Sequence, residues 1–328
     1  MRRYRHLSAE ERDGIARLCH EGVGANEIAR RIGRDKSTVS REIARNGRGG
    51  RYGAAAAQRR ADARRAACRP RRRLDDPALR AEVASRIRDL RWSPQQAGGR
   101  MRREAGGACV VSFSTTCRSI SRGELDPPGC APAERTRGRL RRRGRRRRRR
   151  GEERRGKIRV SHELAERPAE ADARERVGDW EADTVRGGPS EACLVTLVDR
   201  RTRLLVGGLS PSGRAADVAD AEVRALAGRP LETITPDRGK EFASHADVSA
   251  RLGGVQFYFC QPHRPWQRGT NENTNGLIRE FFPKGTNFSG VSEEEVERVF
   301  ALINDRPRKV LGYRTASEAY REVLLHSA

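Results

Sequence analysis

Apolar residues recur at helical spacing near the start of the chain. Leu7, Ile15 and Leu18 give the first segment its apolar side, while Ser8 and Glu11 form a capping-box pattern where that segment begins. The combination predicts an amphipathic helix that starts just after Ser8. The intervening positions are mostly polar or charged, as expected for the solvent side of such a helix.

Two shorter helices are predicted next, one over Asn26–Ile32 and one that begins in the sequence DKSTVSREIARN. Small Ala29, turn-forming Gly33 and apolar Val39 have the spacing that lets two helices cross closely through a tight turn. Residues 1–50 are therefore predicted to form a helix-turn-helix DNA-binding domain; a plain three-helix bundle with a solvated polar face is the alternative. In the DNA-binding interpretation, the third helix enters the major groove with outward-facing donors at Lys36, Ser37, Thr38, Ser40, Arg41 and Arg45.

The pattern weakens over residues 51–75, where alanine alone forms the apolar side of a helical stretch, and we expect a basic linker there. Residues 76–125 regain helical spacing at Val83 and Ile87, and Ser93 has the character of a helix cap in WSPQQAGGRM. This region predicts a second helical DNA-binding unit. Residues 126–160 contain RGRLRRRGRRRRRRG, which cannot bury a core and predicts a disordered linker that also attracts phosphates.

From Val177 onward, alternating apolar positions replace the helical period. GDWEADTVRG and EACLVTLVDRRTRLLVGGLS predict three antiparallel strands, followed by a helix over residues 215–227. A buried strand LETITP, a short helix within residues 240–252, the strand VQFYFC and a further helix come next. The chain is thus predicted to be multidomain, with all-α units followed by an α/β domain over residues 161–328 that holds a mixed five-stranded sheet.

The two halves of the chain also differ in their charge. Residues 1–160 carry 46 Lys and Arg against 18 Asp and Glu, whereas residues 161–328 carry 23 against 26. A basic excess of this size, mostly arginine, indicates a nucleic-acid partner. The sequence has no hydrophobic run long enough to span a membrane and no signal peptide, which favours a cytoplasmic protein without a membrane partner. Its seven cysteines lack metal-ligand spacing and are expected to be reduced thiols.

Three acids in the second half have the placement of a metal site. Asp183 lies in the middle of the first predicted strand, Asp237 directly follows the fourth, and Glu272 is on the helix after the last. If the first and fourth strands are neighbours, the three side chains can converge at one edge of the sheet as oxygen ligands for two Mg²⁺ ions. We expect Gly239 to let the backbone approach closely there.

Nearby acids compete for these roles. Glu241 is the alternative to Asp237, and Glu280 is the alternative to Glu272. Asp179, Glu181 and Asp199 compete with Asp183, and we assign them to strand ends and turns. The pattern alone does not separate a metal site from ordinary surface acids, because any strand-rich domain contains several.

At these residues the chain resembles the DDE transposases of bacterial insertion sequences, specifically the IS-thirty group. The resemblance is carried by RERVGDWEADTV, ITPDRGKEFA, PWQRGTNENTNGLIREFFPKGTNF and NDRPRKVLGYRTASEAY, together with the N-terminal helical segments. The family's catalytic domain is similar to retroviral integrase and ribonuclease H, so the resemblance implies a ribonuclease-H-like core. It also implies an enzyme that cuts double-stranded DNA at the ends of its own element and joins the freed ends to target DNA.

Carried over to this sequence, the family's three acids are Asp183, Asp237 and Glu272, with 34 residues between the last two. They imply Mg²⁺ as cofactor, two ions at the site, with Mn²⁺ able to substitute. Because two element ends must be brought together, a homo-oligomer on DNA is expected. From position and charge, we expect contacts to the DNA backbone from Arg264, Arg268, Asn271, Asn275 and Lys284.

Two departures from the family pattern keep further interpretations open. Residues 105–123 lack a Tyr-rich helix, and Ala316 stands where a proline is expected. These features are consistent with a drifted, inactive copy. The chain is also compatible with a non-catalytic DNA-binding repressor, or with a ribonuclease of the same fold that acts on RNA–DNA hybrids.

Overall fold

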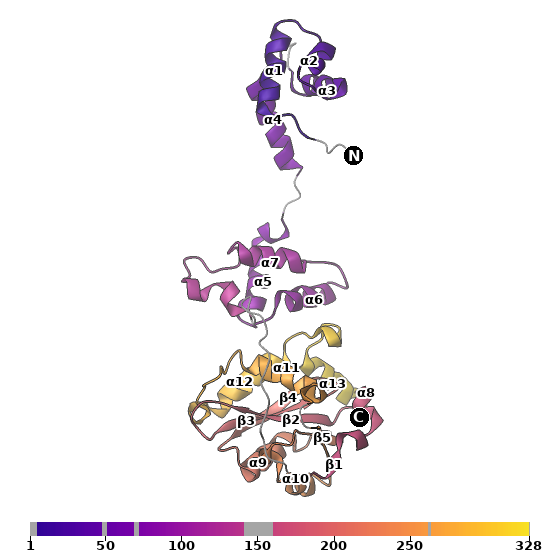
Figure 1. The fold of residues 1–328 in the computed structure, drawn as a ribbon, viewed down its shortest axis with the longest axis vertical. Helices are drawn as coiled ribbons and strands as arrows, with labels where there is room; N and C mark the ends of the chain where they lie inside the picture. Colours follow the sequence, from indigo (N-terminus) through magenta and orange to yellow (C-terminus); the bar gives the residue numbers. More distant parts are fainter. Residues whose placement is uncertain (1–4, 48–50, 69–71, 141–159, 262–263, 328) are drawn as a thin grey trace. The chain divides into compact units, whose positions relative to one another are not determined.

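The computed structural model describes residues 5–47, 51–68, 72–140, 160–261 and 264–327. The chain divides into two compact units, Met1–Arg72 and Arg73–Ala328, which we call unit 1 and unit 2 (Figure 1). Among the described residues, no helix combines the length and the apolar character needed to cross a membrane.

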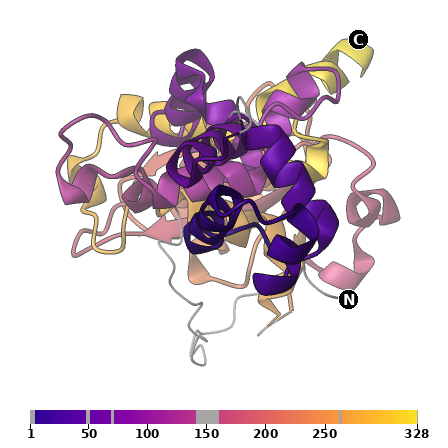
Figure 2. The ribbon, with the colours of Figure 1, turned by 90° about the horizontal axis from the view of Figure 1, so that it is seen from above.

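Unit 1 contains the predicted helix-turn-helix. Helices α1 (Ala9–His20), α2 (Ala25–Arg31) and α3 (Lys36–Asn46) enclose a core that includes Ile15, Ile28 and Val39, all with no exposed surface. The capping box is present, because Ser8 Oγ accepts from the Glu11 amide at 3.1 Å and Glu11 Oε2 accepts from the Ser8 amide at 2.7 Å. The three-helix prediction is confirmed, and Figure 2 shows these helices gathered together from a second direction.

The helical character predicted within residues 51–75 is confirmed, but over most of its length the segment is part of unit 1 and not a separate linker. Residues Ala54–Ala67 form a fourth helix, α4, which packs on α1 through the fully buried Ala57. Arg64 Nη2 donates to Asn46 Oδ1 at 2.8 Å, and Arg12 Nη1 donates to Gln58 Oε1 at 2.7 Å. An apolar side made only of alanine is enough here, because small side chains let two helices lie close together.

Unit 2 begins with the second predicted helical region. It forms α5 (Pro77–Arg88), α6 (Pro94–Glu104) and α7 (Phe113–Ser121), around a core with Val83, Ile87 and Met101. Ser93 caps α6 as predicted, in a capping box with Gln96. Its assignment as a second DNA-binding unit stays a prediction.

The disordered linker predicted over residues 126–160 is wrong at its start. The short 3₁₀ helices η2 (Pro132–Glu134) and η3 (Thr136–Arg139) are ordered. Thr136 is fully buried, donates through Oγ1 to the Leu125 carbonyl at 2.8 Å, and through its amide to Asp126 Oδ1 at 2.7 Å. Residues 141–159, which hold most of the arginine run, lie outside the described residues.

The rest of unit 2 is a three-layer α/β domain. Its mixed sheet has the order β1-β6-β5-β2-β3-β4. The predicted five strands are β2 (Asp179–Arg186), β3 (Cys193–Asp199), β4 (Leu205–Ser210), β5 (Thr233–Thr235) and β6 (Gln256–Phe259). A sixth strand, β1 (His162–Glu163), pairs in parallel with β6, so the predicted strand count was one short. Two residues are too few to produce an alternating pattern.

Helices cover both faces of this sheet (Figure 1). α9 (Ala215–Leu226) and α10 (His245–Arg251) pack on the face that includes Trp180, Leu197 and Phe257. α11 (Gly269–Ile278) and α12 (Glu293–Asn304) pack on the opposite face, against Leu194 and Val198. Because β3 has helices on both sides, all seven of its residues are buried.

Two peripheral helices complete unit 2, α8 (Ala169–Ala173) before the sheet and α13 (Ala316–Ser327) at its end. α13 and α6 are joined by a two-armed ion pair, in which Arg100 Nη1 and Nη2 each lie 2.7 Å from a carboxylate oxygen of Glu318. The ring of Tyr313 packs on Gly99, where an added Cβ would meet it at 2.1 Å. The helical region and the sheet domain are therefore in direct contact.

Candidate active site and DNA-binding surface

The strand pairing brings the first two predicted acids together. β2 and β5 are parallel neighbours, which meets the condition under which the acids were expected to converge, and Glu181 is the register partner of Thr235. Asp183 lies two residues beyond Glu181, and Asp237 lies two residues beyond Thr235. Because parallel strands run in the same direction, both carboxylates emerge at the same edge of the sheet.

Arg268 lies between these two carboxylates. Its Nη1 is 3.2 Å from Asp183 Oδ2, its Nη2 is 2.9 Å from Asp237 Oδ2, and Nη1 also donates to the Ala182 carbonyl at 3.1 Å. The Arg268 side chain is only 14% exposed. In this conformation the guanidinium serves as the counter-ion of the acids, and the contact predicted between Arg268 and the DNA backbone stays a prediction.

The pKa shifts of Asp183 and Arg268 show how burial and the neighbouring charges oppose each other at this site. Burial raises the pKa of Asp183, the Arg268 charge opposes that effect, and the nearby Asp237 carboxylate adds to it. Burial by itself would lower the pKa of Arg268, but the charges of Asp183 and Asp237 outweigh burial and raise it. Two carboxylates held this close need a cation near both of them, because like charges repel strongly where water is partly excluded.

The third predicted acid, Glu272, lies one turn along α11 from Arg268. It is exposed, and it shares one side of the helix with Arg268 and with Asn275, whose Nδ2 donates to Asp183 Oδ2 at 3.0 Å. The described residues contain no group of three His, Cys, Asp or Glu side chains close enough to hold a metal ion. The structure thus brings Asp183 and Asp237 together, and Glu272 lies on the side of α11 that also carries Arg268 and Asn275.

The loop after β5 contains an acid that the sequence pattern did not favour. Glu241 is 6% exposed, and its Oε1 accepts from Thr184 Oγ1 at 3.2 Å, beside Asp183. A Cβ added at Gly239 would lie 2.5 Å from Glu241 Oε2 and 2.8 Å from Asp237 Oδ1. The expected close approach of the backbone is confirmed, because the Gly239 amide donates to Asp237 Oδ1 at 2.8 Å. Gly239 has an ordinary φ of −69°, so it is the missing side chain that leaves room for the two carboxylates.

Another predicted DNA contact, Asn271, is a structural anchor in this conformation. Its side chain is fully buried, and Nδ2 donates to the Glu181 carbonyl at 2.9 Å and to the Thr196 carbonyl at 3.3 Å. Its amide donates to Glu181 Oε2 at 2.9 Å. In this conformation Asn271 ties α11 to the sheet and Asn275 donates to Asp183, and their contacts with the DNA backbone stay predictions.

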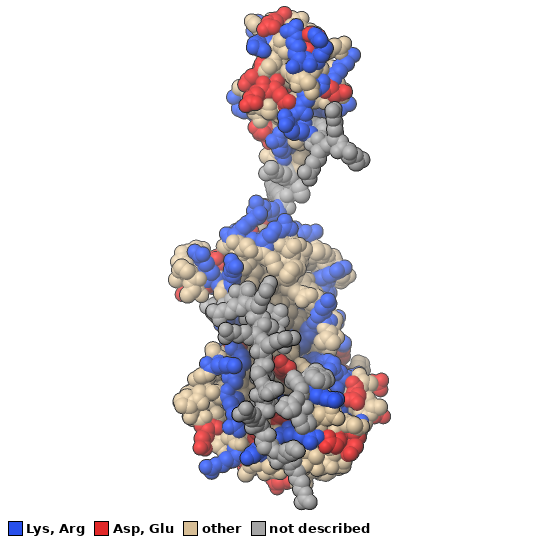
Figure 3. Space-filling view, viewed as in Figure 1, with Lys and Arg blue, Asp and Glu red and all other residues tan. Residues whose placement is uncertain are grey.

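The remaining predicted DNA-binding residues are at the surface. Arg264 and Lys284 are exposed on either side of α11 in the sequence, and their contacts to DNA stay predictions. On α3, Asp35 caps the helix by accepting from the Ser37 amide at 2.7 Å. The predicted donors Lys36, Ser37, Arg41 and Arg45 are exposed, and Thr38 and Ser40 are half-buried. Lys and Arg side chains are prominent on the face of unit 1 that is seen in Figure 3.

The donors at the sheet edge suit a hard divalent cation. Asp183, Asp237 and Glu241 offer carboxylate oxygens of the kind that Mg²⁺ prefers. The position between Asp183 and Asp237 is already cationic, because the Arg268 guanidinium lies there. A divalent metal ion at this edge would have to displace the Arg268 guanidinium, and it would bring one more positive charge to the two carboxylates.

Comparison with known proteins decides the family. Residues 3–46 match the family described as a helix-turn-helix domain. The chain is 38% identical to the transposase for insertion sequence element IS4351 of Bacteroides fragilis, over 98% of this chain and 97% of that protein. It is 36% identical to the transposase for insertion sequence element IS1086 of Cupriavidus metallidurans, over 98% of this chain and 96% of that protein. The chain belongs to the IS30 family of insertion-sequence transposases.

Two further similarities were found. The chain is 36% identical to transposase InsI for insertion sequence element IS30A of Escherichia coli, over 95% of this chain and 82% of that protein. The solved catalytic core domain of BIV integrase aligns with 45% of this chain and 97% of its own, at 16% identity and a TM-score of 0.36. Membership of the transposase family gives the chain a transposase role, and the helix-turn-helix match accounts for DNA binding.

Proposed function

We propose that this transposase binds the terminal inverted repeats of its own insertion sequence and catalyses metal-dependent cleavage and strand transfer of DNA. The observation that carries the proposal is the pair Asp183 and Asp237, held at one sheet edge with a single guanidinium between them. Two carboxylates that lie beside the same guanidinium destabilise a fold through their repulsion unless a cation is bound near both. A metal site requires carboxylates arranged in this way.

In this proposal Asp183, Asp237 and Glu272 hold Mg²⁺, as two ions, with Mn²⁺ able to substitute. Such ions, when bound, activate the attacking hydroxyl and neutralise charge on the leaving oxygen of a phosphodiester. Asn275 positions Asp183 through its 3.0 Å hydrogen bond. Glu272 is exposed on the same side of α11, and in this proposal its carboxylate has to turn toward the pair.

The other residues prepare the site for DNA. Asn271 fixes α11 against β2 and β3, so that the helix cannot slide relative to the acids. Unit 1 reads the ends of the element through α3, and two copies of the chain bring two ends together on DNA. Arg264 and Lys284 supply phosphate contacts beside the site.

The test is cleavage and strand joining by the full chain on DNA that carries its element's ends, with Mg²⁺ or Mn²⁺. Asp237→Asn should lower the rate at least about 100-fold, because it removes a ligand charge, while affinity for the same DNA changes little. Glu297→Gln, at an exposed position of α12, is the matched control. Full activity of Asp237→Asn would refute the assignment, and unchanged repression of the element's promoter by that variant would favour a repressor.

A further inference from the structure

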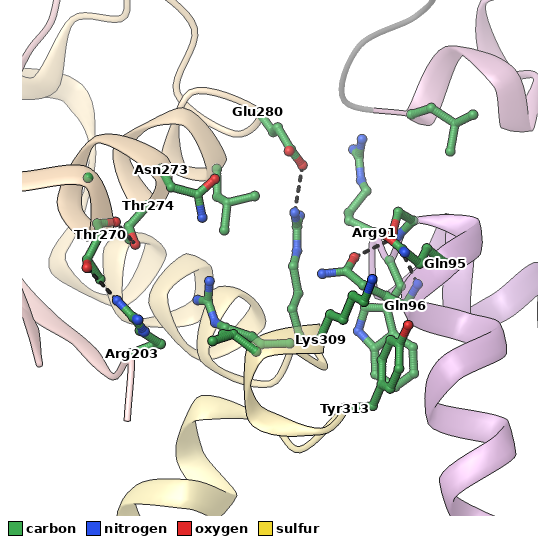
Figure 4. Close-up of a pocket in the computed structure, with 18 of the residues that line it drawn as sticks. Arg91, Gln95, Gln96, Arg203, Thr270, Asn273, Thr274, Glu280, Lys309 and Tyr313 are labelled. Atoms are coloured by element: carbon green, nitrogen blue, oxygen red, sulfur yellow. Dashed lines mark hydrogen bonds and ion pairs between the residues drawn. The ribbon is translucent and has the colours of Figure 1, made fainter. Parts of the chain in front are cut away.

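A cavity of about 560 Å³ lies on the other side of α11 from the acids. Thr270, Asn273, Thr274 and Leu277 line it, and their i, i+3, i+4, i+7 spacing defines one helix side, whereas Arg268, Glu272 and Asn275 fall on another. The opposite wall comes from residues 91–96, which lead into α6 and form its first turn, and the loop before α13 closes the cavity. Figure 4 shows Gln95 and Gln96 across the cavity from Asn273, with Lys309 and Tyr313 between the two walls.

The charge of this cavity is strongly positive. Among the described residues that line it, six are cationic, and the single acid is Glu280. Arg306 Nη1 lies 2.9 Å from Glu280 Oε2, which neutralises one of the cations. The other five cationic side chains line the same cavity. At the sheet edge, in contrast, one arginine lies between two acids.

Two of the arginines are buried without enough partners. Arg306 is 2% exposed and Arg203 is 9% exposed. Arg203 Nη1 donates to Thr270 Oγ1, but Arg203 Nε, Arg306 Nε and Arg306 Nη2 are buried and have no hydrogen-bond partner among the described residues. Burial, followed by the charge of Arg174, lowers the pKa of Arg203 to about 10. Buried donors are nearly always paired in native proteins, so these three call for an acceptor that enters from outside the chain.

Backbone strain is concentrated around the same cavity. The described residues include four non-glycine residues with φ in the left-handed region: Arg91 at 57°, Arg174 at 63°, Arg203 at 67° and Tyr313 at 63°. All four line this cavity. Non-glycine residues adopt this conformation mainly where the surrounding structure holds the backbone in place, as it does at functional sites. Four such residues around one cavity therefore indicate a binding site and not a chance packing defect.

We infer that this cavity, which we call the rear pocket, binds a backbone phosphate of DNA without a metal ion. Arginine guanidinium groups match phosphate oxygens in geometry, and the glutamine and asparagine side chains offer additional donors. The inference rests on the DNA binding included in the proposed function and not on the chemistry of the acids. Since a helix with its side chains is about 10 Å across, the bound phosphate would lie a few nucleotides from the cleavage site.

Free phosphate compounds share this chemistry, so the experiment must separate the two sources. In the full chain, Lys309→Gln and Arg174→Gln each remove an exposed cation from the rear pocket. Each should weaken binding to duplex DNA about three-fold or more at moderate salt and lower the slope of log affinity against log salt by about 0.9. Arg298→Gln, an exposed arginine on α12, is the matched control.

Thermal unfolding without DNA distinguishes binding from a structural role. Arg174 repels Arg203, so Arg174→Gln should leave the melting temperature unchanged or raise it while it weakens DNA binding. A variant that loses stability together with affinity would contradict the inference. So would an equal loss of affinity and slope in Arg298→Gln, because that result would mean a diffuse electrostatic effect.

Hydrogen exchange of the amides at residues 306–313 gives a local measurement. Duplex DNA should slow exchange there in the wild-type chain and equally in Asp237→Asn, even if that variant cannot cleave. Inorganic phosphate at the same phosphate concentration should have no such effect. Protection by inorganic phosphate but not by DNA would overturn the inference, and it would leave the proposed cleavage activity untouched.

Discussion

The two sides of α11 hold their arginines in opposite circumstances. On one side, Arg268 is flanked by two carboxylates and has more negative charge around it than it can neutralise. On the other side, Arg203 and Arg306 share a cavity in which cations exceed acids and buried N–H groups lack partners among the described residues. A count of basic residues therefore does not by itself identify a phosphate-binding site. What matters is whether the chain already supplies the counter-charge.

The strongest test of this contrast is to remove the cation from the acid side. Arg268→Gln should lower the free energy of unfolding by about 2 to 3 kcal/mol without metal, because Asp183 and Asp237 then repel each other in a partly buried setting. Mg²⁺ should restore more stability to this variant than to the wild type, since the ion replaces the missing charge. Urea unfolding with and without Mg²⁺ measures both effects.

Arg298→Gln serves again as the control, and it should change neither the stability nor the response to Mg²⁺. If Arg268→Gln were as stable as the wild-type chain in the absence of metal, Arg268 would not be the counter-ion of the two acids. The contrast between the sheet edge, where the arginine is paired with acids, and the rear pocket would then not hold.

Asn271 tests whether the acid side of α11 is an anchor or a DNA contact. Asn271→Ala should destabilise the fold by about 2 kcal/mol, because the Glu181 and Thr196 carbonyls lose a buried side-chain donor. The backbone amide that donates to the Glu181 carboxylate remains. Affinity for DNA, measured well below the unfolding temperature, should be unchanged. Asn273→Ala is the matched control from the rear-pocket side, and it should leave stability within about 0.5 kcal/mol.

The smallest expected effect concerns the ion pair that joins α6 to α13. Hydrogen bonds from Arg100 lower the pKa of Glu318 to about 2. A carboxyl group with a depressed folded-state pKa stabilises the fold above its unfolded pKa, near 4.5, and loses that contribution as the pH falls toward 2. Glu318→Gln should therefore cost about 1 kcal/mol or less at pH 7 and nothing near pH 2. A cost that persists at pH 2 would show that packing, and not charge, joins the two helices.

Much of the architecture was predictable because regular elements leave repeating marks in the sequence. The alternation in GDWEADTVRG placed β2, and the β2–β5 pairing meets the condition that the first and fourth strands are neighbours. The capping residues Ser8 and Ser93 marked helix starts correctly. By contrast, β1 has two residues, which are too few for an alternating pattern. The helical stretch of α4 was expected, but its single fully buried alanine did not reveal that it packs on α1.

The candidate site was predictable only in part. Asp183 and Asp237 were placed correctly because strand order fixes which strand ends meet, and their joint role as ligands stays a proposal. Asn271 is seven residues before Ile278, so its place on the buried side of α11 was available from helical periodicity and was overlooked. The rear pocket left no such signal, because its residues come from segments more than 200 positions apart, between Arg91 and Tyr313.

The four left-handed residues around the rear pocket have a consequence for protein engineering. Each such conformation costs about 1 kcal/mol or more for a residue with a side chain, and glycine adopts it without that cost. Selection for heat resistance alone would therefore favour replacing Arg91, Arg174 and Arg203 with glycine. Variants selected in this way would gain thermal stability and lose affinity for phosphate. Thermostability would therefore be a misleading criterion for choosing an active transposase.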